Sequence, residues 1–142
     1  MEKIIVSACL LGAPCRYDGK SKPDKRVMAL MDKYDLVPEC AEELGGLNTP
    51  RPPAEIVGNR VINCEGADVT EQYSIGALRV LEIAREKGCK IAVLKSKSPS
   101  CSNSCVYDGS FTRTLRQGRG ICADLLIKNG IRVINEEEID LL

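Results

Sequence analysis

The chain contains no histidine. This absence removes the side chain that most often transfers protons near neutral pH, so a carboxylate is the natural candidate for any general base. Net charge is also absent, because twenty Lys and Arg residues balance twenty Asp and Glu residues, and no overall field favours nucleic acid or a membrane surface. No apolar run is long enough to span a bilayer, and residues 1–4 lead into a strand pattern without a signal peptide. We therefore expect a soluble cytoplasmic protein.

Eight cysteines stand out against this background. Thiols stay reduced in the cytoplasm, so metal binding or redox chemistry explains them better than a disulfide framework. The remaining composition, 44% hydrophobic and 28% charged, is that of an ordinary globular protein. A chain of 142 residues buries enough surface to fold without crosslinks. We therefore expect residues 1–142 to form a single domain.

Short apolar runs alternate with amphipathic segments along the chain. The apolar runs predict buried strands at residues 3–8, 36–40, 90–94 and 131–134. The amphipathic segments predict helices at residues 24–34, 68–88 and 120–129. This alternation predicts an α/β protein with a single-domain, three-layer, Rossmann-like fold, in which a mostly parallel sheet of about four strands is accompanied by a small hairpin.

Turn and capping residues set the expected boundaries of these elements. Asp24 is a candidate cap for the first helix, Asp68 and Glu71 form a capping-box pattern before the second, and Gly88 suits the end of that helix. The predicted hairpin covers residues 55–64 and turns at Gly58-Asn59. Two further segments are predicted as a long polar loop at 96–119 and a last helical turn at 136–140.

Three cysteines follow three of the predicted strands. Cys9, Cys40 and Cys101 each come just after a strand-like run, and the carboxyl ends of parallel strands meet at one edge of a sheet. The local spacings Cys9-x5-Cys15 and Cys101-x3-Cys105 are not zinc knuckles, and no C-x-x-C pair indicates a thioredoxin-like site. An iron–sulfur cluster fits better, because its thiolate ligands need not be local. Three ligands would leave one iron of a [4Fe–4S] cluster open as a Lewis acid.

Other interpretations of the thiols stay open at this point. Any of the three cysteines can be an ordinary buried side chain, which is the preferred interpretation for Cys64, Cys89 and Cys122. Cys15 and Cys105 are undecided between a spare thiol and a sulfur acceptor. A phosphatase-like or arsenate-reductase-like enzyme would use Cys9 as nucleophile, although Cys9-x6-Arg16 is one residue longer than the C-x5-R loop that cradles an oxyanion.

Blocks of sequence throughout the chain resemble the DUF523 family. The similar blocks are Val6–Gly12, Cys15–Gly19, Cys40–Leu47, Pro50–Ile56, Leu94–Cys101 and Tyr107–Phe111. Characterised members of that family are thiouracil desulfidases, which use an oxygen-sensitive [4Fe–4S] cluster to convert a thiolated uracil to uracil and sulfide. The chain departs from the family pattern at Ala41, where proline is usual, and at Ser102, where glycine is usual.

The resemblance implies a role for five residues. Cys9, Cys40 and Cys101 would hold the cluster with one open iron, Glu42 would be the acid/base, and Ser98 would position the substrate. The implied activity is non-redox hydrolysis of a thiolated pyrimidine or nucleotide, a small-molecule substrate. The alternative is a module that carries a cluster or sulfur without hydrolysis.

Several basic side chains accompany these residues. Arg51 lies between two prolines and is expected either to close a pocket or to pair with Glu55. The loop at 96–119 and the residue before it carry several basic side chains that could bind a phosphate: Lys95, Lys97, Arg113, Arg116 and Arg119. Without net charge or an RNA-binding module, the sequence favours a free base or nucleotide over tRNA.

Overall fold

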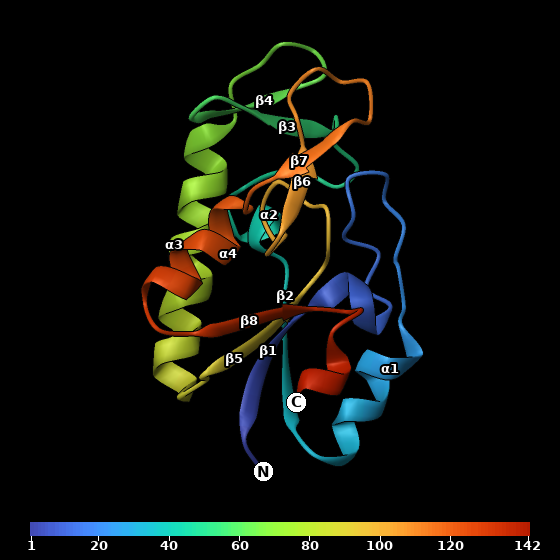
Figure 1. The fold of residues 1–142 in the computed structure, drawn as a ribbon, viewed down its shortest axis with the longest axis vertical. Coiled ribbons are helices and arrows are strands. Elements are labelled where there is room, and N and C mark those ends of the chain that lie inside the picture. Colours follow the sequence, from blue (N-terminus) through green and yellow to red (C-terminus); the bar gives the residue numbers. More distant parts are fainter.

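Four parallel strands form the central sheet of the protein (Figure 1). The computed structural model describes residues 1–142. The order across the sheet is β2 (Asp35–Glu39), β1 (Lys3–Ser7), β5 (Ile91–Leu94) and β8 (Arg132–Asn135), and every neighbouring pair is parallel. These are the four strands predicted from the apolar runs, so that prediction and the parallel sheet are confirmed.

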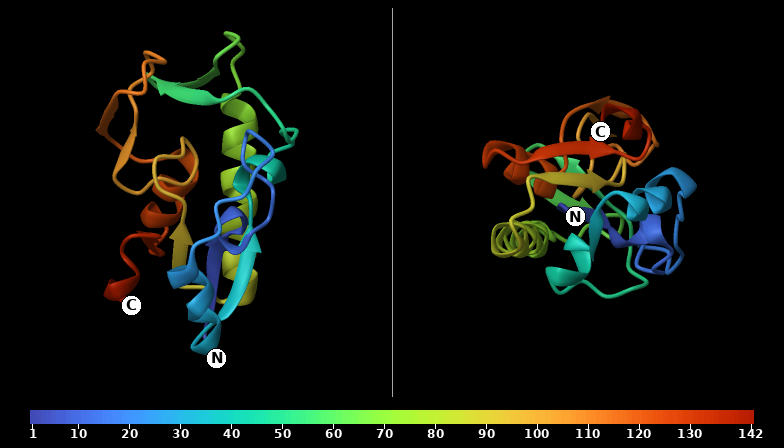
Figure 2. Two further views of the ribbon diagram at one scale, coloured as in Figure 1. Left: turned by 90° about the vertical axis from the view of Figure 1, so that its right-hand side faces the viewer. Right: turned by 90° about the horizontal axis from the view of Figure 1, so that it is seen from below.

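Helices cover both faces of this sheet. On one face, Ile5 of β1 packs in a cluster with residues of α3 (Thr70–Lys87) and α4 (Ile121–Lys128). On the other face, Ile4 and Val6 pack with residues of α1 (Lys25–Met28) and of the 3₁₀ turns η1 (Ala8–Leu11), η2 (Ala29–Asp32) and η3 (Ile139–Leu141). The alternation follows from the period of two in a strand. Figure 2 shows strands lying between α3 and α1 in the view from below, which confirms the predicted three layers.

Two antiparallel hairpins stand beyond the carboxyl ends of the strands, at the top of Figure 1. The pair β3 (Ala54–Val57) and β4 (Arg60–Asn63) is the predicted hairpin. The pair β6 (Cys105–Tyr107) and β7 (Leu115–Gln117) falls within the predicted loop at 96–119, so that prediction is wrong there. Only Val106 of this hairpin is buried, against Ile56 and Val61, and strands this short carry no periodic pattern.

The helix caps are partly as predicted. The Asp24 carboxylate accepts hydrogen bonds from the amides of Arg26 at 2.9 Å and Val27 at 3.3 Å, which confirms the cap of α1. The capping box is wrong, because Asp68 accepts from the amide of Thr70 at 2.9 Å and from the Arg60 guanidinium at 2.8 Å. Gly88 closes α3 in the left-handed conformation at φ 69°, as predicted.

The short helix α2 (Ala41–Leu44) is absent from the sequence-based prediction. Both ends of α2 lie directly against α3. A Cβ added to Gly76 would stand 1.9 Å from the Ala41 carbonyl oxygen, and one added to Gly45 would stand 1.9 Å from the Gln72 carbonyl oxygen. Only glycine allows the two backbones to come so close. This contact fixes α2 at the carboxyl end of β2.

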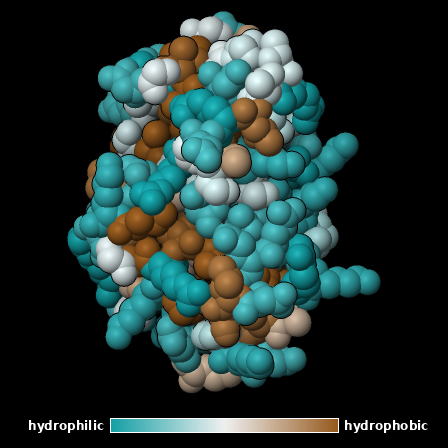
Figure 3. Space-filling view, viewed as in Figure 1, coloured by the Kyte–Doolittle hydropathy of each residue, from teal (hydrophilic) through white to brown (hydrophobic).

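None of the helices combines the length and the apolar character needed to cross a membrane. In the space-filling view, apolar residues gather in patches between hydrophilic ones on the face shown (Figure 3).

We predict that Gly76→Ala lowers the free energy of unfolding by about 1–3 kcal/mol, the usual cost of forcing an extra methyl group into a packed contact. Urea unfolding followed by circular dichroism measures the change. At an unconstrained helical position the same substitution stabilises by up to about 1 kcal/mol. The sign of the change in the free energy of unfolding therefore shows whether the close contact exists. Ser74→Ala on the same helix is the matched control, and a stabilised Gly76→Ala variant would contradict the close contact.

Candidate functional site

A cavity of about 660 Å³ lies at the carboxyl ends of the strands. The sheet order places β1 between β2 and β5. The first connection therefore runs from β1 to β2 on one side, and the next parallel strand, β5, is added on the other side of β1. Such a reversal opens a crevice outside the carboxyl ends of the strands, where α/β proteins bind ligands. The cavity walls come from the ends of these three strands, from α2 and from both hairpins.

All five site residues predicted from the sequence line this cavity: Cys9, Cys40, Glu42, Ser98 and Cys101. The thiols reach it from η1, from the end of β2 and from the loop after β5. The structure therefore brings together three cysteines that are separated by 31 and 61 positions along the chain, as the parallel-strand argument predicted.

The other five cysteines lie in three different places. Cys15 and Cys64 also line the cavity, Cys15 buried and Cys64 exposed. The interpretation of Cys64 as an ordinary buried side chain is therefore wrong, because Cys64 follows the exposed end of the β3–β4 hairpin. Cys89 and Cys122 are buried in the hydrophobic cluster between the sheet and the helices α3 and α4, which agrees with the interpretation of both as core residues. Cys105 lies outside the cavity lining. The position of Cys15 could not be read from the sequence, because it depends on how the loop after η1 folds back.

The cavity thiols influence one another. The Cys40 thiol lowers the pKa of Cys15, but the Cys9 thiol and burial outweigh this effect and raise it to about 11. The Cys15 thiol and burial raise the pKa of Cys40 well above its ordinary value. Burial raises the pKa of Cys101 to about 11, against the opposing effect of the Ser7 and Ser100 hydroxyls. These thiols therefore keep their protons at neutral pH unless a cation stabilises the thiolates.

One buried hydroxyl next to Cys101 has no partner. Ser100 Oγ is the only buried side-chain nitrogen or oxygen atom without a hydrogen bond, and Ser100 is completely buried. An unsatisfied buried hydroxyl is unfavourable, and a thiolate sulfur is an acceptor that would satisfy it. The Ser100 hydroxyl is therefore placed to stabilise a Cys101 thiolate once a cation replaces the thiol proton.

Arg51 holds the Glu42 carboxylate. Its Nε donates to Glu42 Oε2 at 2.8 Å, and its Nη2 donates to the same oxygen and to the Cys15 carbonyl at 3.0 Å. The two side chains are only 6% and 13% exposed, so water screens the pair weakly. This contact answers one alternative from the sequence: Arg51 pairs with Glu42 and not with Glu55, whose carboxylate instead accepts from the amides of Gly109 and Phe111.

Two further residues shape the surroundings of Glu42 and Cys101. Burial and the nearby Glu42 carboxylate raise the pKa of the Tyr73 phenol well above its ordinary value, so Tyr73 stays a proton donor beside Glu42. Its position on the apolar face of α3 gave no functional signal. Ser98 Oγ accepts from the amides of Ser100 at 3.0 Å and Cys101 at 3.1 Å. This turn fixes the loop that carries Cys101 and leaves the Ser98 hydroxyl hydrogen available to a ligand.

The loop after Cys9 does not form an oxyanion cradle. The amides of Gly12, Ala13 and Cys15 donate to carbonyl oxygens within the same loop, at 3.3, 3.2 and 2.9 Å. A phosphatase loop needs such amides free to surround its anion. The structure therefore gives no support to the interpretation of Cys9 as a phosphatase nucleophile.

Unusual backbone conformations gather around the cavity. Lys97, Phe111 and Arg113 are the only residues other than glycine with positive φ, at 66°, 60° and 60°, and all three line the cavity. Such conformations are unfavourable for residues with a Cβ and concentrate at functional sites. The predicted basic loop thus contributes Lys97 and Arg113 to the cavity.

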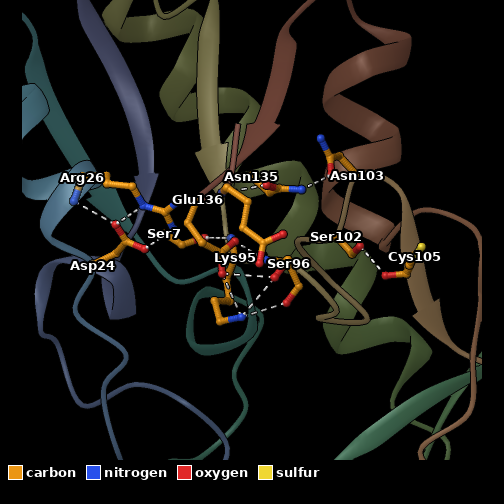
Figure 4. A network of polar contacts seen from close by, with 11 residues as sticks. Ser7, Asp24, Arg26, Lys95, Ser96, Ser102, Asn103, Cys105, Asn135 and Glu136 are labelled. Carbon is orange, nitrogen blue, oxygen red and sulfur yellow. Dashed lines mark hydrogen bonds and ion pairs between the residues drawn. The ribbon is translucent and has the colours of Figure 1, made fainter. Parts of the chain in front are cut away.

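A polar network ties the carboxyl ends of three strands together (Figure 4). Glu136, directly after β8, accepts from the Ser96 amide at 2.8 Å and from the Lys95 ammonium group at 3.0 Å. Ser7, at the end of β1, accepts from the Lys95 amide at 3.0 Å. Because Ser7, Lys95, Ser96 and Glu136 all line the cavity, this network forms one of its walls.

Comparison with known proteins gives consistent matches over nearly the whole chain. The family described as 2-thiouracil desulfurase matches residues 4–138. The protein YbbK of Bacillus subtilis (strain 168) is 39% identical over 147 aligned positions, which cover 96% of this chain and 97% of the relative. Among solved structures, a [4Fe-4S]-dependent thiouracil desulfidase, TudS, is 42% identical with a TM-score of 0.95, and the match covers 100% of this chain and 95% of that one.

The Glu136 network predicts a specific pH dependence of stability. Burial raises the pKa of Glu136, but hydrogen bonds from the Ser96 amide and Lys95 outweigh burial and hold it below its usual value. Because the folded pKa is lower than the unfolded one, the ionised network stabilises the folded state above about pH 4.3, and this stabilisation is lost as the pH falls through the folded pKa. Glu136→Gln should therefore be less stable than wild type at pH 7, with a difference that shrinks in acid.

Urea unfolding at a series of pH values from 7 to 3 measures this difference. Glu82→Gln, on the exposed side of α3, controls for the general loss of one negative charge. A stability difference that stays constant across the whole pH range would contradict the role of the ionised Glu136.

Proposed function

The chain belongs to the 2-thiouracil desulfurase family, and on this premise we propose that it hydrolyses a thiolated uracil or its nucleotide to the oxo form and sulfide. The observation that carries the proposal is the meeting of Cys9, Cys40 and Cys101 in one cavity beside the Glu42 carboxylate. A histidine-free chain must use another base, and Glu42 is the carboxylate that the structure holds in place there by Arg51.

We infer that Cys9, Cys40 and Cys101 hold a [4Fe–4S] cluster. Thiolates from distant parts of a chain are its usual ligands, and the unpartnered Ser100 hydroxyl supplies a donor to the sulfur of Cys101. When bound, a cluster with three thiolate ligands supplies an open iron, a Lewis acid toward the sulfur of the substrate.

Glu42 takes the proton of the attacking water in this proposal. Arg51 orients the carboxylate through two nitrogens on one oxygen, which leaves the other oxygen of Glu42 for water. Tyr73 stays protonated beside it, and the Ser98 hydroxyl donates to the pyrimidine. Overall, one water oxygen replaces one sulfur on the ring carbon, and the sulfur leaves as hydrogen sulfide. No electron is transferred, so the reaction needs no redox partner.

The rest of the molecule suits a small substrate. The cavity of about 660 Å³ admits a pyrimidine or its nucleotide, and zero net charge gives no general attraction to nucleic acid. We place the reaction in the cytoplasm, because eight free cysteines and a thiolate-held cluster require reducing conditions. Residues 1–142 would act as one domain, since the walls of the cavity come from both ends of the chain.

The cluster proposal predicts that protein purified without oxygen carries about four iron and four acid-labile sulfide per chain. Cys9→Ser, Cys40→Ser and Cys101→Ser should each lose this content, because every one removes a ligand. Iron and sulfide analysis measures the loss. Cys64→Ser, which changes another thiol of the same cavity, is the matched control and should load fully. Full iron content in any of the three variants would remove that residue from the ligand set.

The base proposal predicts that Glu42→Gln keeps its iron and sulfide but turns over thiouracil about 10²- to 10⁴-fold more slowly, the usual contribution of a positioned base. Release of uracil and sulfide under anaerobic conditions measures the rate. Glu39→Gln changes another carboxylate of the cavity, one that Arg51 does not bind, and should keep its rate. A fully active Glu42→Gln variant would end the role of Glu42, and a cluster-loaded wild type without turnover would favour the carrier alternative.

A further inference from the structure

Two side chains that can bind a metal, Cys15 in the cavity wall and the exposed Glu43 just outside it, have no role in the proposed reaction. The sulfur of Cys15 and a carboxylate oxygen of Glu43 lie within 4.8 Å of each other and of the Cys40 sulfur. We refer to these three residues as the Cys15–Cys40–Glu43 trio. Cys40 belongs to the proposed cluster ligands, whereas Cys15 and Glu43 do not.

The spacing of the trio suits a single metal ion. Two sulfurs bound to one tetrahedral Zn²⁺ at about 2.3 Å stand about 3.8 Å apart, and a carboxylate oxygen bound at about 2.1 Å comes similarly close to both. Ligands that converge within 4.8 Å are compatible with this geometry. Ligands of a [4Fe–4S] cluster bind different irons and stand farther apart, so the trio is not a set of cluster ligands.

A common set of hydrogen bonds positions the trio. The Thr49 hydroxyl donates to the Glu43 carboxylate at 2.5 Å and accepts from Arg51 Nη1 at 2.8 Å. The Cys15 carbonyl accepts from Arg51 Nη2 at 3.0 Å and from the Cys40 thiol at 3.8 Å. Hydrogen bonds to ligating groups are typical of metal sites, where they orient the ligands before the ion arrives.

We propose that the Cys15–Cys40–Glu43 trio binds one thiophilic divalent cation of the Zn²⁺ class, and that this ion and the cluster exclude each other because both require Cys40. Each thiol releases its proton to solvent as its sulfur bonds the ion, and no electron is transferred. The exclusion rests on the proposed function, whereas the ion site does not. A chain without its cluster would thus hold a single ion that must leave before the cluster can form.

Cobalt(II) tests the ion site directly, since thiolate-to-cobalt charge transfer gives an absorption that counts bound sulfurs. We expect the reduced, iron-free full chain to bind one Co²⁺. Cys15→Ser and Glu43→Gln should each bind at least about tenfold more weakly, because removing a ligand costs at least as much as removing its supporting partner. Cys64→Ser and Cys101→Ser, which alter other cavity thiols, should keep the wild-type affinity. Equal cobalt affinity in wild type and Cys15→Ser would overturn the site, provided that thermal unfolding shows both chains folded.

Competition with zinc tests the exclusion. One equivalent of Zn²⁺ should prevent wild-type chain from taking up iron and sulfide under anaerobic reconstitution, and a chelator should restore the uptake. Cys15→Ser should load its cluster with or without zinc. Cluster assembly in wild type with zinc still bound would overturn the exclusion. Failure of zinc-free wild type to form any cluster would overturn the proposed function and the exclusion together, whereas the cobalt titration decides the ion site independently.

Discussion

The site depends on the parallel direction of the strands. β2, β1 and β5 run side by side in the same direction, so their carboxyl ends arrive at one edge of the sheet. β1, β2 and β5 end at Ser7, Glu39 and Leu94. Cys9, Cys40 and Cys101 follow these ends by two, one and seven positions. Three thiols from distant parts of the sequence thereby meet without a local motif. If one strand ran the other way, its thiol would lie at the opposite end of the sheet.

Arg51 is the second organising element, because it joins three segments that the sheet alone does not fix. The guanidinium binds the Glu42 carboxylate, the Cys15 carbonyl and the Thr49 hydroxyl. It thereby joins the helix α2, the loop after η1 and the proline-rich segment to one another. A guanidinium stays charged at any physiological pH, and its planar fork serves several acceptors at once. Lysine has the charge but not this geometry. The proposed base and the trio therefore share one positively charged support.

The sequence predicted the parts of the structure that leave a periodic or continuous pattern. The four buried strands and the cap at Asp24 were visible, and the parallel direction of the strands then followed from general rules for α/β folds. The order β2-β1-β5-β8 was not predicted, because no local pattern records which strands are neighbours. The helix α2 and the hairpin β6–β7 were not visible, because elements of four and three residues are too short to show a period. The Arg51–Glu42 pair and the place of Cys15 were missed for another reason. Both depend on how irregular loops fold back over the sheet, which no local pattern records.

The protonation of the cavity thiols, and with it the charge of the cavity, depends on whether a metal is bound. Without one, the raised pKa values of Cys15, Cys40 and Cys101 keep these thiols neutral, and Arg51 balances Glu42. A bound metal would reverse the protonation of these thiols, because its positive charge stabilises the thiolate form. The thiolate sulfur can then accept a hydrogen bond from a donor such as Ser100 Oγ. A structural ion at the trio would use Cys40 in this way and leave Cys101 protonated, whereas a cluster would engage both. Under the two proposals the site would be filled in chemically different ways, and the unused thiol would distinguish them, Cys101 beside an ion and Cys15 beside a cluster.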